Sequence, residues 1–255
     1  TLFLSQGQRI TTDSRKIEKG QIFFALKGEN FDGNQYAEEA LKLGARYVVV
    51  DDIQMKNREH HIYVENVLDA LQRLALLHRR VLNTPIIAIT GSNGKTTTKE
   101  LIHAVLSMKF KVACTKGNLN NHIGIPLTIL DIKPYDEISI VEMGANHRGE
   151  IASYCQYVEP NYGLITNIGK AHLEGFGGIE GVLKGKSELF DYISSREGLI
   201  FLNMDDEKLR NRAAGLKSLS YGMHPNATYR GEIMETDSNF LTLLIEEESK
   251  KLSIQ

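Results

Sequence analysis

Lys95 and the residues around it are the strongest candidates for chemistry in this sequence. The segment Thr90-Gly-Ser-Asn-Gly-Lys-Thr-Thr-Thr98 places two glycines before a lysine and three threonines. Backbone N–H groups in a glycine loop and at a helix N-terminus point toward a bound anion, and the helix dipole favours negative charge there. The segment therefore predicts a nucleotide-phosphate site, in which Lys95 reaches the outer phosphates and the Thr96 hydroxyl binds Mg²⁺.

The spacing of this segment is shorter than the general phosphate-loop pattern, which has a further glycine where Ile89 stands. A strand-to-helix turn that merely contains Gly-Lys-Thr is the alternative. The flanks favour a phosphate loop, because residues 86–89 form an apolar run and residues 101–106 carry an apolar helical stripe. The predicted ATP contacts are Gly91, Ser92, Asn93, Gly94, Lys95, Thr96 and Thr97.

Three more polar residues follow strands or lie on a helix of the same region. Glu142 ends the apolar run 138–141, where a neighbouring parallel strand would bring a carboxylate to a phosphate-bound Mg²⁺. An ordinary acidic residue at a strand end is the alternative. His172 lies in a loop, and Lys186 lies on a helix. From the residues alone, a surface histidine and a solvated lysine are the simpler interpretations.

The elements that must position these residues alternate between strand and helix. Apolar runs predict strands near residues 21–26, 47–50, 62–64, 86–89, 111–115, 138–142, 162–166 and 198–203. Helical stripes between them imply βαβ units. The predicted fold class is therefore α/β, with a small N-terminal α/β domain over residues 1–83. A mostly parallel, P-loop-type α/β domain follows over residues 84–255 and carries an antiparallel hairpin at 228–246 with its turn at 237–239.

Composition excludes several classes of protein. The chain has 255 residues, 42% of them hydrophobic, and a formal charge of −2, so it has no basic excess for nucleic acid or membrane surfaces. No apolar run is long enough for a membrane span, and no signal-like N-terminus is present. Cys114 and Cys155 are too few for a disulfide framework or a zinc site. We expect a cytoplasmic protein, and a start at Thr1 with an end at Gln255 suggests a fragment.

The motifs together resemble one known family. Thr90 to Glu100 is similar to the ATP loop of the Mur ligases, which add amino acids to the bacterial cell-wall precursor. Val141-Glu-Met-Gly-Ala-Asn-His-Arg-Gly-Glu150 and Thr166-Asn-Ile-Gly-Lys-Ala-His-Leu-Glu-Gly175 resemble one branch of that family. Asp13-Ser-Arg15 and the segment 23–33 resemble its N-terminal, UDP-binding domain.

This resemblance implies an activity and a domain plan. The branch joins D-alanyl-D-alanine (D-Ala-D-Ala) to UDP-N-acetylmuramoyl-tripeptide (UDP-MurNAc-tripeptide) through an acyl phosphate, at the expense of ATP. It implies Mg²⁺ as a cofactor, small molecules as the only partners, a monomer, and a place in the bacterial cytoplasm. It also implies three domains, of which a third, Rossmann-like one is absent from this sequence. Residues 1–83 would bind the UDP-sugar substrate, and residues 84–255 would bind ATP.

The resemblance also changes the interpretation of single residues. It implies that Thr96 and Glu142 hold one Mg²⁺, that His172 holds a second, and that Lys186 is carbamylated to N-carboxylysine. Lys95, His172 and Lys186 are then the catalytic residues. Asn34 replaces the histidine that the family commonly has after Asp-Gly, which puts one uridine contact in doubt. The implied substrate contacts are Ser14, Arg15, Lys27, Asp32, Gly33, Asn120 and Asn121.

Three alternatives stay open at this point. A sister ligase or a folylpolyglutamate synthase would share the ATP loop, although the Gly-Ala-Asn-His segment at 144–147 counts against both. A P-loop nucleotide switch would have no site for a small-molecule carboxylate. A third alternative is that this chain binds UDP-sugar and ATP and is inactive by itself.

Overall fold

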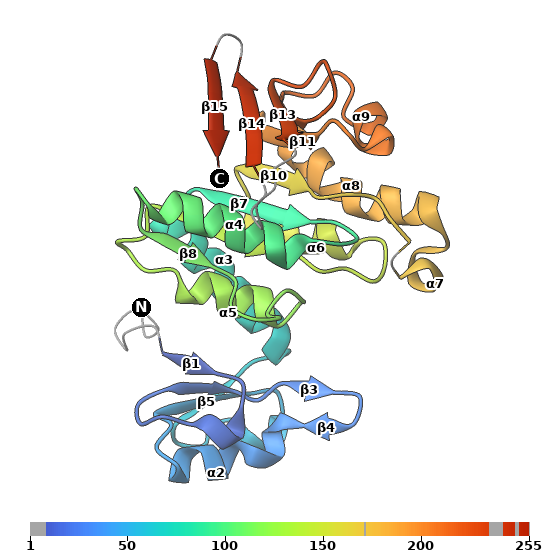
Figure 1. Cartoon of the computed structure of the whole chain (residues 1–255). Helices are drawn as coiled ribbons and strands as arrows, with labels where there is room; N and C mark the ends of the chain where they lie inside the picture. Colours follow the sequence, from blue (N-terminus) through green and yellow to red (C-terminus); the bar gives the residue numbers. More distant parts are fainter. Residues whose placement is uncertain (1–8, 171, 235–241, 248–249, 255) are drawn as a thin grey trace. The chain divides into compact units, whose positions relative to one another are not determined.

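A computed structural model describes residues 9–170, 172–234, 242–247 and 250–254 (Figure 1). The chain divides into two compact units, Thr1–His78 and Arg79–Gln255. α3 (Val67–Leu82) begins in the first unit, and its last residues belong to the second. Among the described residues, no helix has both the length and the apolar character that a membrane span requires.

The first unit is built on a parallel sheet with the strand order β1-β2-β5-β6. β2 and β5 are its buried centre, because Phe23, Val48 and Val50 pack with Ala37 and Ala40 of the neighbouring helical segment. These strands and helices are β1 (Ile10–Thr11), β2 (Ile22–Phe24), β5 (Tyr47–Val50), β6 (His61–Tyr63), α2 (Ala37–Lys42) and the 3-10 turns η1 (Ser14–Lys16), η2 (Gly33–Tyr36) and η3 (Ile53–Met55). A separate antiparallel pair, β3 (Lys27–Gly28) with β4 (Phe31–Asp32), leads into η2.

The second unit is built on one long sheet with the order β15-β14-β13-β12-β11-β10-β7-β9-β8. The strands from β8 to β13 pair in parallel, and β14 and β15 extend the sheet in the antiparallel sense. Their bounds are β7 (Ile86–Thr90), β8 (Val112–Cys114), β9 (Ile138–Glu142), β10 (Tyr162–Ile165), β11 (Leu199–Asn203), β12 (Ser218–Gly222), β13 (Tyr229–Met234), β14 (Thr242–Glu247) and β15 (Lys250–Ile254).

Helices cover both faces of this sheet, because side chains alternate along each strand. Ile87 and Leu164 face α4, where Ile102 packs against them. Gly163 faces the opposite side, where a Cβ would lie 3.1 Å from Leu189 of α8. The helices are α4 (Lys95–Ser107), α5 (Gly124–Asp131), α6 (Glu150–Val158), α7 (Leu173–Phe176), α8 (Ile179–Ser195) and α9 (Glu207–Arg212).

The strand order places a crevice at the carboxyl ends of β7, β9 and β10. After β7 the chain crosses to β8 and β9 on one side, and it then returns to β10 on the other side of β7 (Figure 1). In parallel α/β sheets, ligands bind where the strand order reverses in this way. A ligand-binding site is therefore expected at the carboxyl ends of these three strands.

The predicted α/β class with a mostly parallel sheet is confirmed. The hairpin expected at 228–246 corresponds to β13 and β14, which pair from Tyr229 with Glu247 to Met234 with Thr242. Its expected turn at 237–239 lies outside the described residues. Strands β12 and β15 of the second unit and the two-residue strands β1, β3 and β4 of the first unit were not predicted.

Candidate functional site

The loop between β7 and α4 has a backbone that only glycine adopts without strain at two positions. Gly91 has φ +145°, and a Cβ there would lie 1.9 Å from the Thr166 hydroxyl oxygen. Gly94, the N-cap of α4, has φ +75°. Both glycines of the predicted phosphate loop are therefore needed for its shape. Helix α4 begins at Lys95, so its free N–H groups lie at this loop.

The loop is braced by the residues that follow β10. The Asn93 carbonyl accepts hydrogen bonds from Thr166 Oγ1 at 2.6 Å and from Asn167 Nδ2 at 3.1 Å. The Asn167 side chain in turn accepts from the Asn93 N–H at 3.2 Å. Ser92 Oγ accepts from the Gly169 N–H at 2.9 Å. The loop shape is therefore fixed by protein contacts on both sides of Asn93.

Lys95 lies folded against this loop. Its Nζ donates to the Gly91 carbonyl at 2.8 Å. Burial lowers the pKa of Lys95, and the nearby charge of Glu142 opposes that change. The backbone N–H groups of the loop and the Lys95 ammonium thus lie at the same place, and the lysine adds a positive charge where phosphate oxygens would bind.

Glu142 and Thr96 meet, as the sequence predicted. Thr96 Oγ1 donates to the Glu142 carboxylate, 3.0 Å from Oε2, and Asn120 Nδ2 donates to Oε1 at 2.8 Å. Glu142 is 1% exposed, and the Thr96 hydroxyl and the Asn120 amide that donate to its carboxylate are both neutral. A buried carboxylate with only neutral donors fits a bound cation, and a hydroxyl with a carboxylate is an oxygen donor set that suits Mg²⁺.

A cavity of about 270 Å³ lies beside this pair. It collects four of the residues that the sequence singled out: Lys95, Asn120, Asn121 and His172. Its other lining residues are His122, Gly144, Ala145, Asn146, Glu150 and Tyr154. The loops after β7, β8, β9 and β10 thus converge, as expected for the carboxyl ends of parallel strands.

His172 is an exposed residue at the start of α7, and its backbone has the left-handed φ of 52°. Glu150 lines the same cavity, where its carboxylate accepts from the Asn146 N–H at 2.6 Å and from the His147 N–H at 3.1 Å. Across the part of the chain that the structure describes, no group of three or more His, Cys, Asp or Glu side chains could hold a metal. Mg²⁺ commonly takes few protein ligands and completes its shell with phosphates and water, so such a group is not required.

Lys186 is buried, which the residue type alone did not predict. It lies on α8 with a 1% exposed side chain, and its Nζ lies 5.4 Å from the centre of the Phe176 ring. Burial, together with the positive charge of Lys95, lowers the pKa of Lys186 to about 8. A lysine amine in this state is more often neutral at physiological pH than an exposed one.

The predicted substrate residues of the first unit carry their own contacts. Arg15 forms a bidentate pair with Asp13, with nitrogen–oxygen distances of 2.9 and 3.0 Å. The hydrogen bonds from Arg15 lower the pKa of Asp13 to about 2. Lys27 Nζ lies 2.8 Å from Asp51, and this hydrogen bond raises the pKa of Lys27. Ser14 opens η1, which carries Arg15.

Asn34, the departure from the family pattern, is a structural residue here. Its side chain is 2% exposed and donates to Asp32 at 2.7 Å and to Asp51 at 2.8 Å. Asp32 also caps η2, while a Cβ on Gly33 would lie 2.5 Å from the Leu26 carbonyl oxygen. One tight turn is therefore formed by Asp32, Gly33 and Asn34. This turn also orients Asp51, a residue that was not predicted from the sequence.

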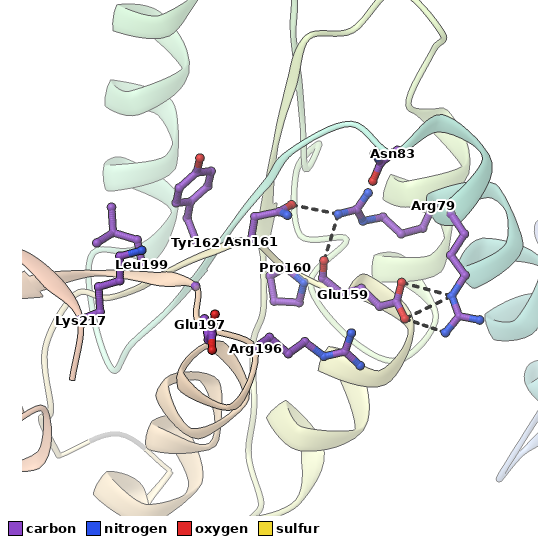
Figure 2. A pocket seen from close by; sticks show the side chains of 12 residues that line it. Arg79, Asn83, Glu159, Pro160, Asn161, Tyr162, Arg196, Glu197, Leu199 and Lys217 are labelled. Atoms are coloured by element: carbon purple, nitrogen blue, oxygen red, sulfur yellow. Dashed lines mark hydrogen bonds and ion pairs between the residues drawn. The ribbon is translucent and has the colours of Figure 1, made fainter. Parts of the chain in front are cut away.

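A second cavity of about 660 Å³ lies at the opposite, amino-terminal edge of the large sheet (Figure 2). The 5% exposed Arg79 donates to the carbonyls of Val158 and Glu159, each at 3.0 Å, and to the Asn161 side chain at 2.9 Å. These carbonyls lie at the end of α6, where a helix leaves its last acceptors unpaired. Arg80 pairs with the Glu159 carboxylate at 2.7 Å. Arg79 and Arg80 thus both bind groups at the end of α6.

Comparison with known proteins places the chain in a family. A sequence profile of the Mur ligase middle domain matches residues 89–255, and one described as the Mur ligase family catalytic domain matches residues 8–79. The chain belongs to the Mur ligase family.

Individual relatives show which members of the family the chain is similar to. Over 223 residues the chain is 40% identical to the UDP-N-acetylmuramoyl-tripeptide–D-alanyl-D-alanine ligase of Bacillus subtilis. The aligned region covers 87% of this chain and 48% of that protein. Crystal structures of MurF from Acinetobacter baumannii and of MurF from Thermotoga maritima in complex with ADP both give a TM-score of 0.87. They are 31% and 30% identical to the chain and cover 96% of it, against 54% and 57% of their own chains. The chain thus spans about half the length of these relatives.

Several residues of the site were missed from the sequence. Glu150 and Asn146 lie within the quoted segment 141–150, yet neither was selected. Glu188 was also missed; its carboxylate accepts from the Gly149 and Ala152 N–H groups at 2.7 and 2.9 Å and so joins α8 to the start of α6. The role of Glu188 depends on tertiary contacts, for which the sequence holds no local signal. The Glu150 contacts are local, to N–H groups three and four residues earlier at the start of α6, and could have been predicted.

Proposed function

We propose that this chain provides the substrate-binding and nucleotide-binding units of an ATP-dependent ligase of the MurF type. Such an enzyme joins D-Ala-D-Ala to UDP-MurNAc-tripeptide in the bacterial cytoplasm. The observation that carries the proposal is the arrangement of Lys95, Thr96 and Glu142 at a braced glycine loop, in a chain 40% identical to such a ligase. Residues 1–83 are assigned to the UDP-sugar and residues 84–255 to ATP, in a protein that works as a monomer.

The proposed reaction has two steps. An oxygen of the tripeptide carboxylate attacks the γ-phosphorus of ATP, ADP leaves, and an acyl phosphate forms. The amine of D-Ala-D-Ala then attacks the acyl carbon, inorganic phosphate leaves, and the nitrogen loses its proton. Lys95 and the N–H groups at the start of α4 hold the β- and γ-phosphates and stabilise the charge that moves to the leaving oxygen.

Residues beside the loop supply the remaining contacts to the nucleotide and metal. Gly91, Ser92, Asn93, Gly94 and Thr97 complete the nucleotide contacts with Lys95 and Thr96. Thr96 and Glu142 would hold one Mg²⁺, and His172, which lines the 270 Å³ cavity together with Lys95, would hold a second. Bound Mg²⁺ would neutralise phosphate charge and hold the attacking carboxylate oxygen close to the γ-phosphorus.

Lys186 is proposed as an N-carboxylysine. Carbamylation requires a neutral amine, whose nitrogen attacks CO₂ and loses a proton to give a carbamate. A pKa of about 8 favours that neutral amine, and the nearby charge of Lys95 would stabilise the resulting anion. The carbamate would then support the second Mg²⁺.

The first unit is proposed to hold the UDP end of the substrate. The contacts assigned to it are Ser14, Arg15, Lys27, Asp32 and Gly33, of which the arginine and lysine suit a diphosphate. Asn120 and Asn121 of the second unit line the cavity and would contact the reacting end of the substrate. The remaining half of a MurF-type protein would complete the site for nucleotide and amine.

Calorimetric titration of the chain tests this proposal. Saturable binding of UDP-MurNAc-tripeptide is expected, weakened by Arg15→Ala and unchanged by Arg58→Ala, which removes another exposed arginine paired with a carboxylate. Mg·ADP binding is expected to be lost in Lys95→Ala and kept in Lys184→Ala. If the chain binds nucleotide but does not bind UDP-MurNAc-tripeptide, the result favours a P-loop switch and refutes the ligase assignment.

A further inference from the structure

Lys99 is a fully buried lysine whose role the proposed mechanism leaves unassigned. It lies on α4, one turn after Lys95, and its side chain is 1% exposed. Its Nζ donates to the Thr115 carbonyl oxygen at 2.6 Å and pairs with the Glu100 carboxylate at 2.9 Å. Lysine is rarely buried unless specific partners hold it, so these contacts point to a defined task.

The Thr115 contact leads from Lys99 to the predicted metal ligand. Thr115 is 0% exposed and directly follows β8. Its hydroxyl accepts from the Glu142 N–H at 2.9 Å, and its own N–H donates to the Ile140 carbonyl at 3.0 Å. Thr115 is therefore bonded to Lys99 through its carbonyl and to the end of β9 through its hydroxyl and amide.

The loop that begins at Thr115 returns to the same carboxylate. The Asn120 carbonyl accepts from the Gly144 N–H at 2.8 Å, and the Asn120 side chain donates to Glu142 at 2.8 Å. The Glu142 carboxylate thus accepts hydrogen bonds from Thr96 of α4 and from Asn120 of the loop. Lys99 holds the first residue of that loop.

We propose that Lys99 is a positioning residue for the Mg²⁺ site: through Thr115 it fixes the Glu142 backbone and the loop that delivers Asn120. Thr96 and Lys99 are three residues apart, so they lie on the same side of α4. One face of α4 therefore contacts the Glu142 carboxylate directly through Thr96 and also binds Thr115, which holds the Glu142 backbone, through Lys99. This inference rests on the proposed function for its effect on nucleotide, although the positioning itself can be measured without nucleotide.

The first measurement is amide hydrogen exchange on the free chain. In Lys99→Met, which keeps the length of the side chain, we expect the Glu142 N–H to exchange at least about tenfold faster, because a freed Thr115 no longer holds its acceptor in place. Glu100→Gln is the matched control, since it removes the exposed partner and leaves the bond from Lys99 to Thr115. Unchanged protection of the Glu142 N–H in Lys99→Met would overturn the proposal.

The second measurement is the affinity for ADP with and without Mg²⁺. Outer partners of metal ligands typically change metal affinity by about 10–100-fold. Lys99→Met is expected to weaken Mg·ADP binding about tenfold and to leave ADP binding in EDTA unchanged. Thr115→Val should act in the same way, and the double variant should be no weaker than the weaker single variant, because both act through one connection.

The outcomes separate this inference from the proposed function. Equal losses with and without Mg²⁺, or additive effects in the double variant, would mean that Lys99 only supports the fold, and would refute the positioning role. If the unaltered chain binds ADP no better with Mg²⁺, the proposed metal site fails. The exchange rate of the Glu142 N–H then decides the role of Lys99 by itself.

Discussion

Replacing Lys186 by methionine is expected to stabilise the chain in a pH-dependent manner. A pKa lowered from 10.5 to about 8 means that the folded state binds the Lys186 proton less tightly than the unfolded state does. At about 1.4 kcal/mol for each pH unit, the charged lysine costs the fold about 3 kcal/mol at pH 7. Lys186→Met removes this cost and retains an apolar side chain beside Phe176.

The sign and the pH window follow from the same difference. Below pH 8 both states hold the proton, so the cost stays constant. Between pH 8 and 10.5 the folded state loses its proton first, and the wild-type chain gains stability relative to the variant. The advantage of Lys186→Met should therefore fall from about 3 kcal/mol at pH 7 to about 1 kcal/mol at pH 9.5.

Guanidinium chloride unfolding measured between pH 6 and 9.5 checks this prediction. Buffers must be free of CO₂, because carbamylation would consume the amine that is being titrated. Lys184→Met is the matched control, since Lys184 is an exposed lysine on the same helix. A stability difference for Lys186→Met that does not vary with pH would refute the lowered pKa, and with it the main support for carbamylation.

Other substitutions test the loop, the metal ligand and the end of α6. Gly91→Ala should lower stability by about 1–3 kcal/mol and abolish ADP binding, because its Cβ would overlap the Thr166 hydroxyl; thermal unfolding and titration measure both effects. Glu142→Gln should weaken Mg·ADP binding about 10–100-fold with little change in Mg²⁺-free binding, and equal losses would argue against a metal ligand. Arg79→Met should cost about 3 kcal/mol in denaturant unfolding, since three acceptors lose a charged donor. Arg80→Met should cost less than about 1 kcal/mol because its ion pair is exposed, and equal costs for the two arginines would contradict the capping role of Arg79.

The phosphate loop and its neighbours were predictable because their signals are local or follow from parallel pairing. The glycines, lysine and threonines of the loop are contiguous, and the apolar run of β7 precedes them. The contact between Thr96 and Glu142 followed from one rule, that parallel strands bring their carboxyl ends to one edge. A local motif and one topological rule were thus sufficient to predict that the phosphate loop, Thr96 and Glu142 lie together in the candidate site.

The burial of Lys186 required an observation that the sequence contains but that was not used. Lys186 lies four residues after Val182 and three before Leu189, so it interrupts an apolar stripe that continues to Ile193. The helical period therefore placed it on the buried face. By contrast, no local pattern could have found the bond from Lys99 to Thr115, because it joins α4 to a loop that only the tertiary fold brings near.

The strands missed at the C-terminal side have a physical explanation. β12 consists of Ser-Leu-Ser-Tyr-Gly, in which small polar residues and a glycine weaken the apolar signal. β15 has two leading lysines, which are typical of solvated edge strands. Sheet extension in this region depends on pairing with β11 and β14, which supplies hydrogen bonds that composition does not reveal.

The bracing of Asn93 has a consequence for how quickly nucleotide can bind. Since two hydrogen bonds hold the Asn93 carbonyl, the loop does not need to close around an incoming phosphate. Only Lys95 must exchange the Gly91 carbonyl for a phosphate oxygen, and side chains change rotamer within nanoseconds or less. Association rates should then rise linearly with nucleotide concentration, without a plateau. A competing compound would likewise meet a surface that is already formed and would lose no affinity to ordering the loop.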